Sequence, residues 1–166
     1  MDGPEGDALR EAFVAFHRRN ALDWTPGRWC VSFAVRTSGE LAGVQAAEGV
    51  WAGGRLSVET GSWLGLAFQR RGVGTLMRAA VLELVFAGLG AATATSGAFE
   101  LNTASARVSE RLGYRPDDET FLAPRGVPVR QRRFRIDRDT WLDNPDRPTV
   151  AITGLDACLH LFGVTG

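Results

Sequence analysis

Gln69-Arg70-Arg71-Gly72-Val73-Gly74-Thr75 is the segment from which the fold of this chain can be inferred. A strand-like apolar run over 62–66 precedes it, and a helix-like apolar run follows it. The first N–H groups of a helix have no partner within the helix, and the helix dipole makes that end positive. Glycine lets an anion approach this backbone closely. The segment therefore predicts a cradle for a pyrophosphate.

Two common phosphate-binding motifs do not fit this segment. The dinucleotide fingerprint G-x-G-x-x-G fails because Met77 stands where its third glycine belongs, and no Gly-Lys-Ser/Thr triplet of a P-loop occurs in the chain. A surface turn with incidental glycines remains the alternative for the loop alone, because the chain contains 20 glycines in 166 residues. The pattern that fits is Gln/Arg-x-x-Gly-x-Gly/Ala.

That pattern is the acyl-CoA pyrophosphate loop of the GNAT acetyltransferases, and residues 60–114 resemble the RimJ/RimL-type branch of that superfamily. Several short motifs occur in the family's order and approximate spacing, which is more specific than any one of them. They are Gly61-Ser62-Trp63-Leu64-Gly65, the loop itself, Met77-Arg78-Ala79-Ala80-Val81-Leu82, Ser96-Gly97-Ala98, Asn102-x-x-Ser105 and Leu112-Gly113-Tyr114. The resemblance is clear over about 29–142 and implies an N-acetyltransferase that uses acetyl-CoA and a primary amine, either a protein N-terminus or a small molecule.

Composition is that of one soluble globular domain. The chain has 45% apolar and 23% charged residues, and its 19 basic residues balance 19 acidic ones. A net charge of zero gives no broad attraction to nucleic acid or to acidic membranes. Cys30 and Cys158 form neither a disulfide framework nor a zinc spacing, so we expect no metal and a reduced, cytoplasmic setting. No apolar run reaches the length that crosses a bilayer.

The chain predicts alternating strands and helices in a mixed sheet. Strand, helix, strand, helix and strand over 56–120 imply crossover units with parallel pairing, preceded by an antiparallel hairpin. The fold class is therefore α/β, a mixed twisted sheet with helices on both faces, as in the GNAT fold. The expected elements are a disordered lead over 1–7, a helix from Ala8 to about Asn20 capped by Asp7, strands at 29–36, 41–48 and 56–66, a helix at 72–87 with an apolar stripe that includes Leu76, a strand at 91–97, a helix from Asn102 to before Gly113, strands from Tyr114 and at 129–136, and a short helix at 137–142.

Two features set the expected domain limits. Residues 1–144 are predicted to form one domain, and 145–166 a linker and a tail that packs on the domain or on a second subunit. GNAT proteins of this type usually carry a further first strand and first helix before the equivalent of Ala8. This domain is thus expected to be shortened at its start, with an uncovered sheet edge that the tail or a homodimer partner would cover.

The proposed acyl-CoA contacts follow from the loop and the resemblance. The backbone amides of 71–75 would bind the pyrophosphate, with the Thr75 hydroxyl and the charges of Arg70 and Arg71 as additions, although solvated arginines are the alternative. The resemblance assigns the pantetheine arm to the strand backbone and, further on, to the Asn-x-x-Ser motif. The predicted binding residues are Leu64, Gly65, Leu66, Gln69, Arg70, Arg71, Gly72, Val73, Gly74, Thr75, Asn102 and Ser105.

The predicted catalytic residues are Ser105, Glu59 and Asn102. Ser105 is the candidate proton donor to the leaving sulfur, unless it only bonds its own backbone. Asn102 is a helix cap that by resemblance also reaches the pantetheine. Many GNAT enzymes carry a tyrosine acid where this chain has Ser109, and Tyr114 is expected to pack in the sheet.

The general base is the least specified group. Glu59 is the first candidate, by resemblance, and Glu48 the second, while a plain surface carboxylate is the alternative for either. His17 and His160 are read as structural. A non-catalytic acyl-CoA-binding module and a truncated, partner-binding relative remain the competing functions.

Overall fold

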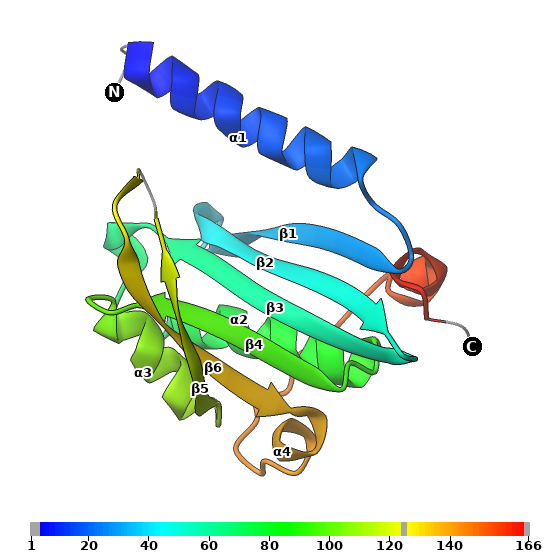
Figure 1. The fold of residues 1–166 in the computed structure, drawn as a ribbon. Coiled ribbons are helices and arrows are strands. Elements are labelled where there is room, and N and C mark those ends of the chain that lie inside the picture. The colour runs from blue at the N-terminus through cyan, green and yellow to red at the C-terminus, as the bar shows by residue number, and fades with distance from the viewer. Residues whose placement is uncertain (1–3, 124–125, 165–166) are drawn as a thin grey trace.

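A six-stranded mixed sheet forms the centre of the molecule (Figure 1). The computed structural model describes residues 4–123 and 126–164. The strand order is β1-β2-β3-β4-β6-β5, and among these described strands only β3 and β4 pair in parallel. The strands are β1 (Arg28–Thr37), β2 (Glu40–Ala52), β3 (Arg55–Leu64), β4 (Thr93–Phe99), β5 (Arg115–Leu122) and β6 (Val129–Asp137).

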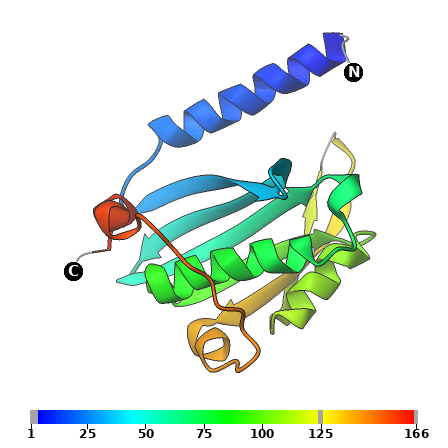
Figure 2. The ribbon, with the colours of Figure 1, turned by 180° about the vertical axis from the view of Figure 1, so that it is seen from behind.

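Helices α2 and α3 lie together on one face of the sheet (Figure 2). The helices are α1 (Pro4–Leu22), α2 (Val73–Glu83), α3 (Thr103–Arg111) and α4 (Arg138–Leu142), and α2 continues into a π-helical turn, Leu84–Gly88. Helix α1 instead projects from the β1 edge of the sheet, where Asn20 Nδ2 donates to Cys30 Sγ at 3.2 Å. Phe13 and Phe16 on α1 are about half exposed. The sheet face opposite α2 therefore has little helical cover.

The main core lies between the sheet and α2. Alternate residues of a strand point to opposite faces, so Leu56, Val58 and Thr60 of β3 are buried whereas their neighbours are exposed. Leu82 and Phe86 of the α2 segment are buried against them, together with Ala79, Val81 and Val85. The prediction that Leu76 belongs to the buried apolar stripe of this helix was wrong, because its side chain is 60% exposed. The helix turns that residue outward just before its buried positions begin at Met77.

The C-terminal tail folds back onto β1 and β2. Trp24 and Trp51 each donate an indole N–H to a tail carbonyl, those of Leu161 and Phe162, at 2.8 Å. Phe162 is buried among Trp24 and Trp29. The tail thus belongs to the same apolar cluster as the domain.

The hairpin predicted at 37–40 and the strands around it are confirmed, but several boundaries differ. Helix α1 begins at Pro4, so Asp7 lies within it and pairs with Arg10 at 3.7 Å instead of capping it. Of the lead expected to be disordered, 1–3 lie outside the described residues and 4–7 are helical. Strand β2 runs on to Ala52, and β3 ends at Leu64.

Candidate functional site

An opening between β3 and β4 forms the centre of the site. Their parallel ladder runs from Ser57↔Thr93 to Thr60↔Ser96 and then stops. Strand β3 continues its pairing with β2 as far as Leu64, and β4 continues with β6 as far as Phe99. The two central strands therefore separate beyond Thr60 and Ser96, and each keeps one unpaired edge there.

Ser62 and Leu64 direct their backbone groups toward this opening. The N–H of Gly65 donates to the carbonyl of Ala42 in β2 at 2.9 Å, and successive residues of a strand direct their backbone groups to alternate sides. The Leu64 carbonyl accepts a hydrogen bond from Gln69 Nε2 at 3.0 Å. The N–H of Leu64 is therefore the group that this residue can offer to a ligand.

The predicted pantetheine contacts are therefore only partly available on this edge. Leu64 faces the opening, but the N–H of Gly65 is already paired with β2. Leu66 lies outside the strand, in a 3-10 turn, and is 86% exposed. The sequence prediction missed Ser62, whose backbone shares the free edge with Leu64.

The predicted pyrophosphate cradle lies at the start of α2, next to this edge. Gly72 is the N-cap with φ of 79°, and no side chain caps the helix. Among the described residues, no acceptor bonds the N–H groups of 71–74, whereas the N–H of Thr75 donates to the Gly72 carbonyl at 3.0 Å. The Thr75 amide is thus engaged inside the helix. Four of the five amides that were predicted to bind the pyrophosphate therefore remain free to do so among the described residues.

The surroundings of these amides suit an anion. The first turn of α2 has no acidic residue, and a Cβ placed on Gly72 would meet no atom within 4 Å. Arg70 and Arg71 are exposed, and neither forms an ion pair within the described part of the chain. Unpaired N–H groups at a positive helix end with room above them fit a diphosphate.

Helix α3 begins on the other side of the opening, directly after β4. Asn102 caps it as predicted, because Asn102 Oδ1 accepts from the N–H of Ser105 at 3.1 Å. Ser105 Oγ lies 3.5 Å from Arg78 Nη2. Ser109 Oγ, one turn further on, donates to the Ser105 carbonyl at 3.3 Å. The alternative considered for Ser105, a serine bonded to the backbone of its own helix, thus describes Ser109 instead.

Arg78 is a buried cation that the sequence prediction missed as a site residue. Its side chain reaches from α2 toward β3 and α3 and is 4% exposed. It donates to Ser109 Oγ at 2.8 Å and to Ser62 Oγ at 3.2 Å. Burial lowers the pKa of Arg78, an effect that Tyr114 partly opposes, but arginine stays charged in proteins. One sequence signal was available: an arginine inside the most apolar helix of the chain.

Glu59, the first candidate for the general base, lies on the opposite face of the sheet. Both of its carboxylate oxygens accept from Arg133 of β6, at 3.0 and 3.3 Å, and Arg133 also donates to Thr95 Oγ1 at 3.3 Å. Glu48, the second candidate, stands directly opposite Glu59 in β2 and pairs with Arg28 at 3.2 Å. Each carboxylate thus has an arginine partner.

A comparison with protein families decides the assignment. The model of the acetyltransferase (GNAT) domain family matches residues 4–115, which is more than half of the chain. The chain belongs to this family. It carries a GNAT acetyltransferase domain, and RimJ is among the solved structures that share its fold.

Solved GNAT structures share this fold at low sequence identity. Mycobacterium smegmatis RimJ, in complex with CoA-disulfide, is 20% identical with a TM-score of 0.69, over 82% of this chain and 63% of its own. The spermidine N-acetyltransferase SpeG from Vibrio cholerae is 17% identical, with a TM-score of 0.63 over 82% of this chain and 78% of its own. The protein yncA from Salmonella typhimurium, in a structure with its cofactor acetyl-CoA, is 16% identical, with a TM-score of 0.60 over 84% of this chain and 78% of its own. This chain thus spans less than two thirds of the RimJ chain.

Tyr114 does not occupy the opening of this GNAT domain. It is buried beneath the sheet, where its hydroxyl lies 3.3 Å from Thr60 Oγ1, and Thr60 Oγ1 donates to the Thr95 carbonyl at 3.0 Å. Burial raises the pKa of Tyr114, and the hydrogen bond to Thr60 and the charge of Arg78 only partly oppose this. Tyr114 therefore stays a neutral packing residue, as predicted.

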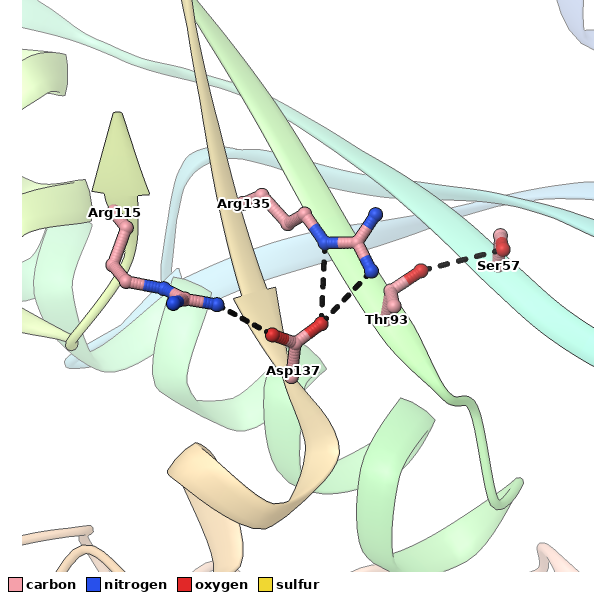
Figure 3. Close-up of polar contacts among 5 residues, drawn as sticks. All are labelled: Ser57, Thr93, Arg115, Arg135 and Asp137. Carbon is pink, nitrogen blue, oxygen red and sulfur yellow. Dashed lines mark hydrogen bonds and ion pairs between the residues drawn. The ribbon is translucent and has the colours of Figure 1, made fainter. Parts of the chain in front are cut away.

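The face that carries Glu59 is polar along the central strands. Figure 3 shows its end away from the opening, where Asp137 accepts from Arg115 at 2.6 Å and from Arg135 at 3.0 and 3.1 Å. Thr93 donates there to Ser57 at 3.3 Å. These bonds show that the uncovered face carries polar side chains and paired charges.

Two other kinds of site receive no support. No group of three or more His, Cys, Asp or Glu side chains gathers as metal ligands in the part of the chain that the structure describes. His17 packs against Phe13 and Phe16 on α1, with ring centroids 4.3 and 5.3 Å away. No described helix has the length and apolar character needed to cross a membrane.

Proposed function

We propose that this GNAT protein transfers the acetyl group of acetyl-CoA to a primary amine, either a protein N-terminus or a small molecule, by direct attack. The observation that carries the proposal is the position of the opening. The separated edges of β3 and β4 lie next to the glycine-rich start of α2, whose N–H groups lack acceptors among the described residues. A single acetyl-CoA molecule would thus place its diphosphate at the start of α2 and its extended arm along the separated strand edges.

We assign most of the predicted contacts to this arrangement and leave out Gly65, Leu66 and the amide of Thr75. The amides of 71–74 would bind the pyrophosphate, and Arg70 and Arg71 would add charge at its rim. The backbone of Leu64 and Ser62 would pair with the pantetheine arm as an added strand would. Asn102 and Ser105 would face the same arm from the start of α3.

The two faces of the opening would take different parts of the reaction. As the amine nitrogen bonds to the thioester carbon, the C–S bond breaks and its electron pair stays on sulfur. The amine proton passes to a base, and Glu59 on the open face is our candidate. Ser105, on the helix face, would donate a hydrogen bond to the sulfur. The base and the donor then stand on opposite sides of the sheet.

Isothermal titration with acetyl-CoA tests the proposal, and Thr75→Asp sharpens it. A carboxylate in the first turn of α2 favours the helix by about 0.3–1 kcal/mol but repels a pyrophosphate. We therefore expect Thr75→Asp to weaken acetyl-CoA binding at least tenfold with no loss of thermal stability. Ala52→Asp, exposed at the end of β2 away from the loop, is the control for added charge and should bind normally. No acetyl-CoA binding by the folded wild-type protein would refute the proposal.

The Glu59–Arg133 pair favours a second candidate, an acyl-CoA-binding module without turnover. Both carboxylate oxygens of Glu59 already accept hydrogen bonds from Arg133, so this pair would have to open before Glu59 could contact an amine. Free-thiol release across a panel of amines separates the two candidates. Amine-dependent release supports the transferase, and tight binding without release supports the module.

A further inference from the structure

Arg78 presents an uncompensated positive charge at the base of the opening. Within the described chain, no carboxylate pairs with it, and its side-chain partners are the hydroxyls of Ser62, Ser105 and Ser109. Its Nε is buried without a partner among the described residues. A buried charge without a counterion is costly, so its retention points to an anion that arises nearby.

The hydrogen-bond directions show how the charge would reach the opening. Arginine donates five hydrogen bonds and accepts none, so each serine oxygen bonded to Arg78 acts as the acceptor. The Ser109 hydroxyl donates its own hydrogen bond to the Ser105 carbonyl. Ser62 and Ser105 must direct their hydrogens away from the guanidinium, and no acceptor bonds either hydroxyl within the described residues. Arg78 therefore orients two hydroxyls as donors.

These two hydroxyls flank the opening from its two sides. Ser62 lies on β3 beyond the last pair with β4 and is exposed, and Ser105 lies in the first turn of α3 and is half-buried. A single nitrogen, Arg78 Nη2, contacts both, at 3.2 and 3.5 Å. The buried Arg78 cation thus polarises one hydroxyl on each side of the opening, close to the point where β3 and β4 separate.

We propose that Arg78 is a positioning residue that, through Ser62 and Ser105, stabilises the CoA thiolate released when the C–S bond breaks. The inference rests on the proposed function, because the acetyl transfer described above is what generates an anion in this opening. The electron pair of the C–S bond stays on sulfur, and the hydroxyl donors and the guanidinium offset that charge. This arrangement would replace the tyrosine acid whose place Ser109 takes.

The ionisation of CoA bound to the protein tests this role without turnover. A cation within about 4–6 Å lowers the pKa of an acidic group by about 1–3 units, so we expect the bound thiol to titrate at least one unit below free CoA, as followed by thiolate absorbance. Arg78→Gln should return it to the value of free CoA. Ser62→Ala and Ser105→Ala, which keep Arg78, should each cause part of that return, and Ser57→Ala, at the other end of β3, should cause none.

Kinetics supplies the second readout. Loss of a donor to charge that develops in the transition state costs about 10²–10³ in kcat, so Arg78→Gln should lower kcat within this range and leave the KM for acetyl-CoA within about threefold. Arg78→Lys, which keeps the charge, should recover part of the rate. An unshifted thiol pKa in wild-type protein, or equal kcat in wild type and Arg78→Gln, would overturn the inference. Failure of wild-type protein to bind CoA at all would instead refute the proposed function.

Discussion

The indole of Trp29 and the phenyl ring of Phe162 meet edge to face, with ring centroids 4.9 Å apart and 88° between the ring planes. Trp29 lies on edge strand β1, and Phe162 lies in the C-terminal tail. Both side chains are buried, although no strand pairs with the outer edge of β1 in the described part of the chain. The tail therefore completes the core beside this edge.

Removal of the Phe162 ring should destabilise the whole domain. Phe→Ala substitutions in a core cost about 3–5 kcal/mol, and we expect Phe162→Ala to lower the free energy of unfolding within this range. Urea denaturation measures the change. Leu161→Ala is the matched control, because this neighbouring side chain is exposed and its loss should cost less than about 1 kcal/mol. Equal effects of the two changes would contradict the packing described.

Gly49 of β2 makes room for the Trp29 indole. A Cβ at Gly49 would overlap the Trp29 ring, so Gly49→Ala forces the ring or the strand to move. Overpacking of this kind costs about 1–3 kcal/mol. We expect Gly49→Ala to lower the thermal midpoint of unfolding. Gly61→Ala on β3 should leave that midpoint unchanged, because a Cβ there meets nothing within 4 Å. A stable Gly49→Ala protein would be evidence against this close approach.

Asn102 allows its two roles to be separated. Loss of the cap in Asn102→Ala should cost about 1 kcal/mol of stability, because the N–H of Ser105 loses its acceptor. Asn102→Ser keeps a capping oxygen and should restore stability. If Asn102 also contacts the pantetheine arm, the serine variant will still bind acetyl-CoA more weakly than wild type in titration calorimetry. Full affinity in the serine variant would limit Asn102 to the cap.

Tyr114 gives a direct test of pH-dependent stability. It is the one tyrosine in the sequence, so the ultraviolet band of tyrosinate reports on it alone. Burial raises the pKa of Tyr114 in the folded state above the ordinary value of about 10. The folded state then holds the proton more tightly than the unfolded state, so this stability contribution is complete below about pH 10 and is lost as pH rises through the folded pKa.

We therefore expect tyrosinate to form only above pH 10, together with loss of structure seen by circular dichroism. Tyr114→Phe should flatten the fall of stability over the same alkaline range. A reversible titration near pH 10 in a folded protein would show that the phenol is accessible to water.

Local features of the sequence determined most of the elements and the position of the cradle. Ser38 and Gly39 make a hairpin turn with positive φ angles, and Gly72 takes the left-handed conformation that opens α2. Such turns depend on a few adjacent residues, and glycine alone adopts them without steric cost. Asn102 was identifiable as a cap for the same reason.

The tertiary structure alone decided which groups face the opening. Arg78 meets Ser62, Ser105 and Ser109 only because α2, β3 and α3 pack together, and the same packing turns Leu76 outward. The bond between Glu59 and Arg133 likewise depends on the order β3-β4-β6, in which β4 lies between their strands. Hydrophobic periodicity specifies which face of an element is buried, but not which distant side chain lies opposite it. The glycine-rich loop could thus be located from its own residues, whereas the position of the Arg78 charge at the base of the opening could be seen only in the fold.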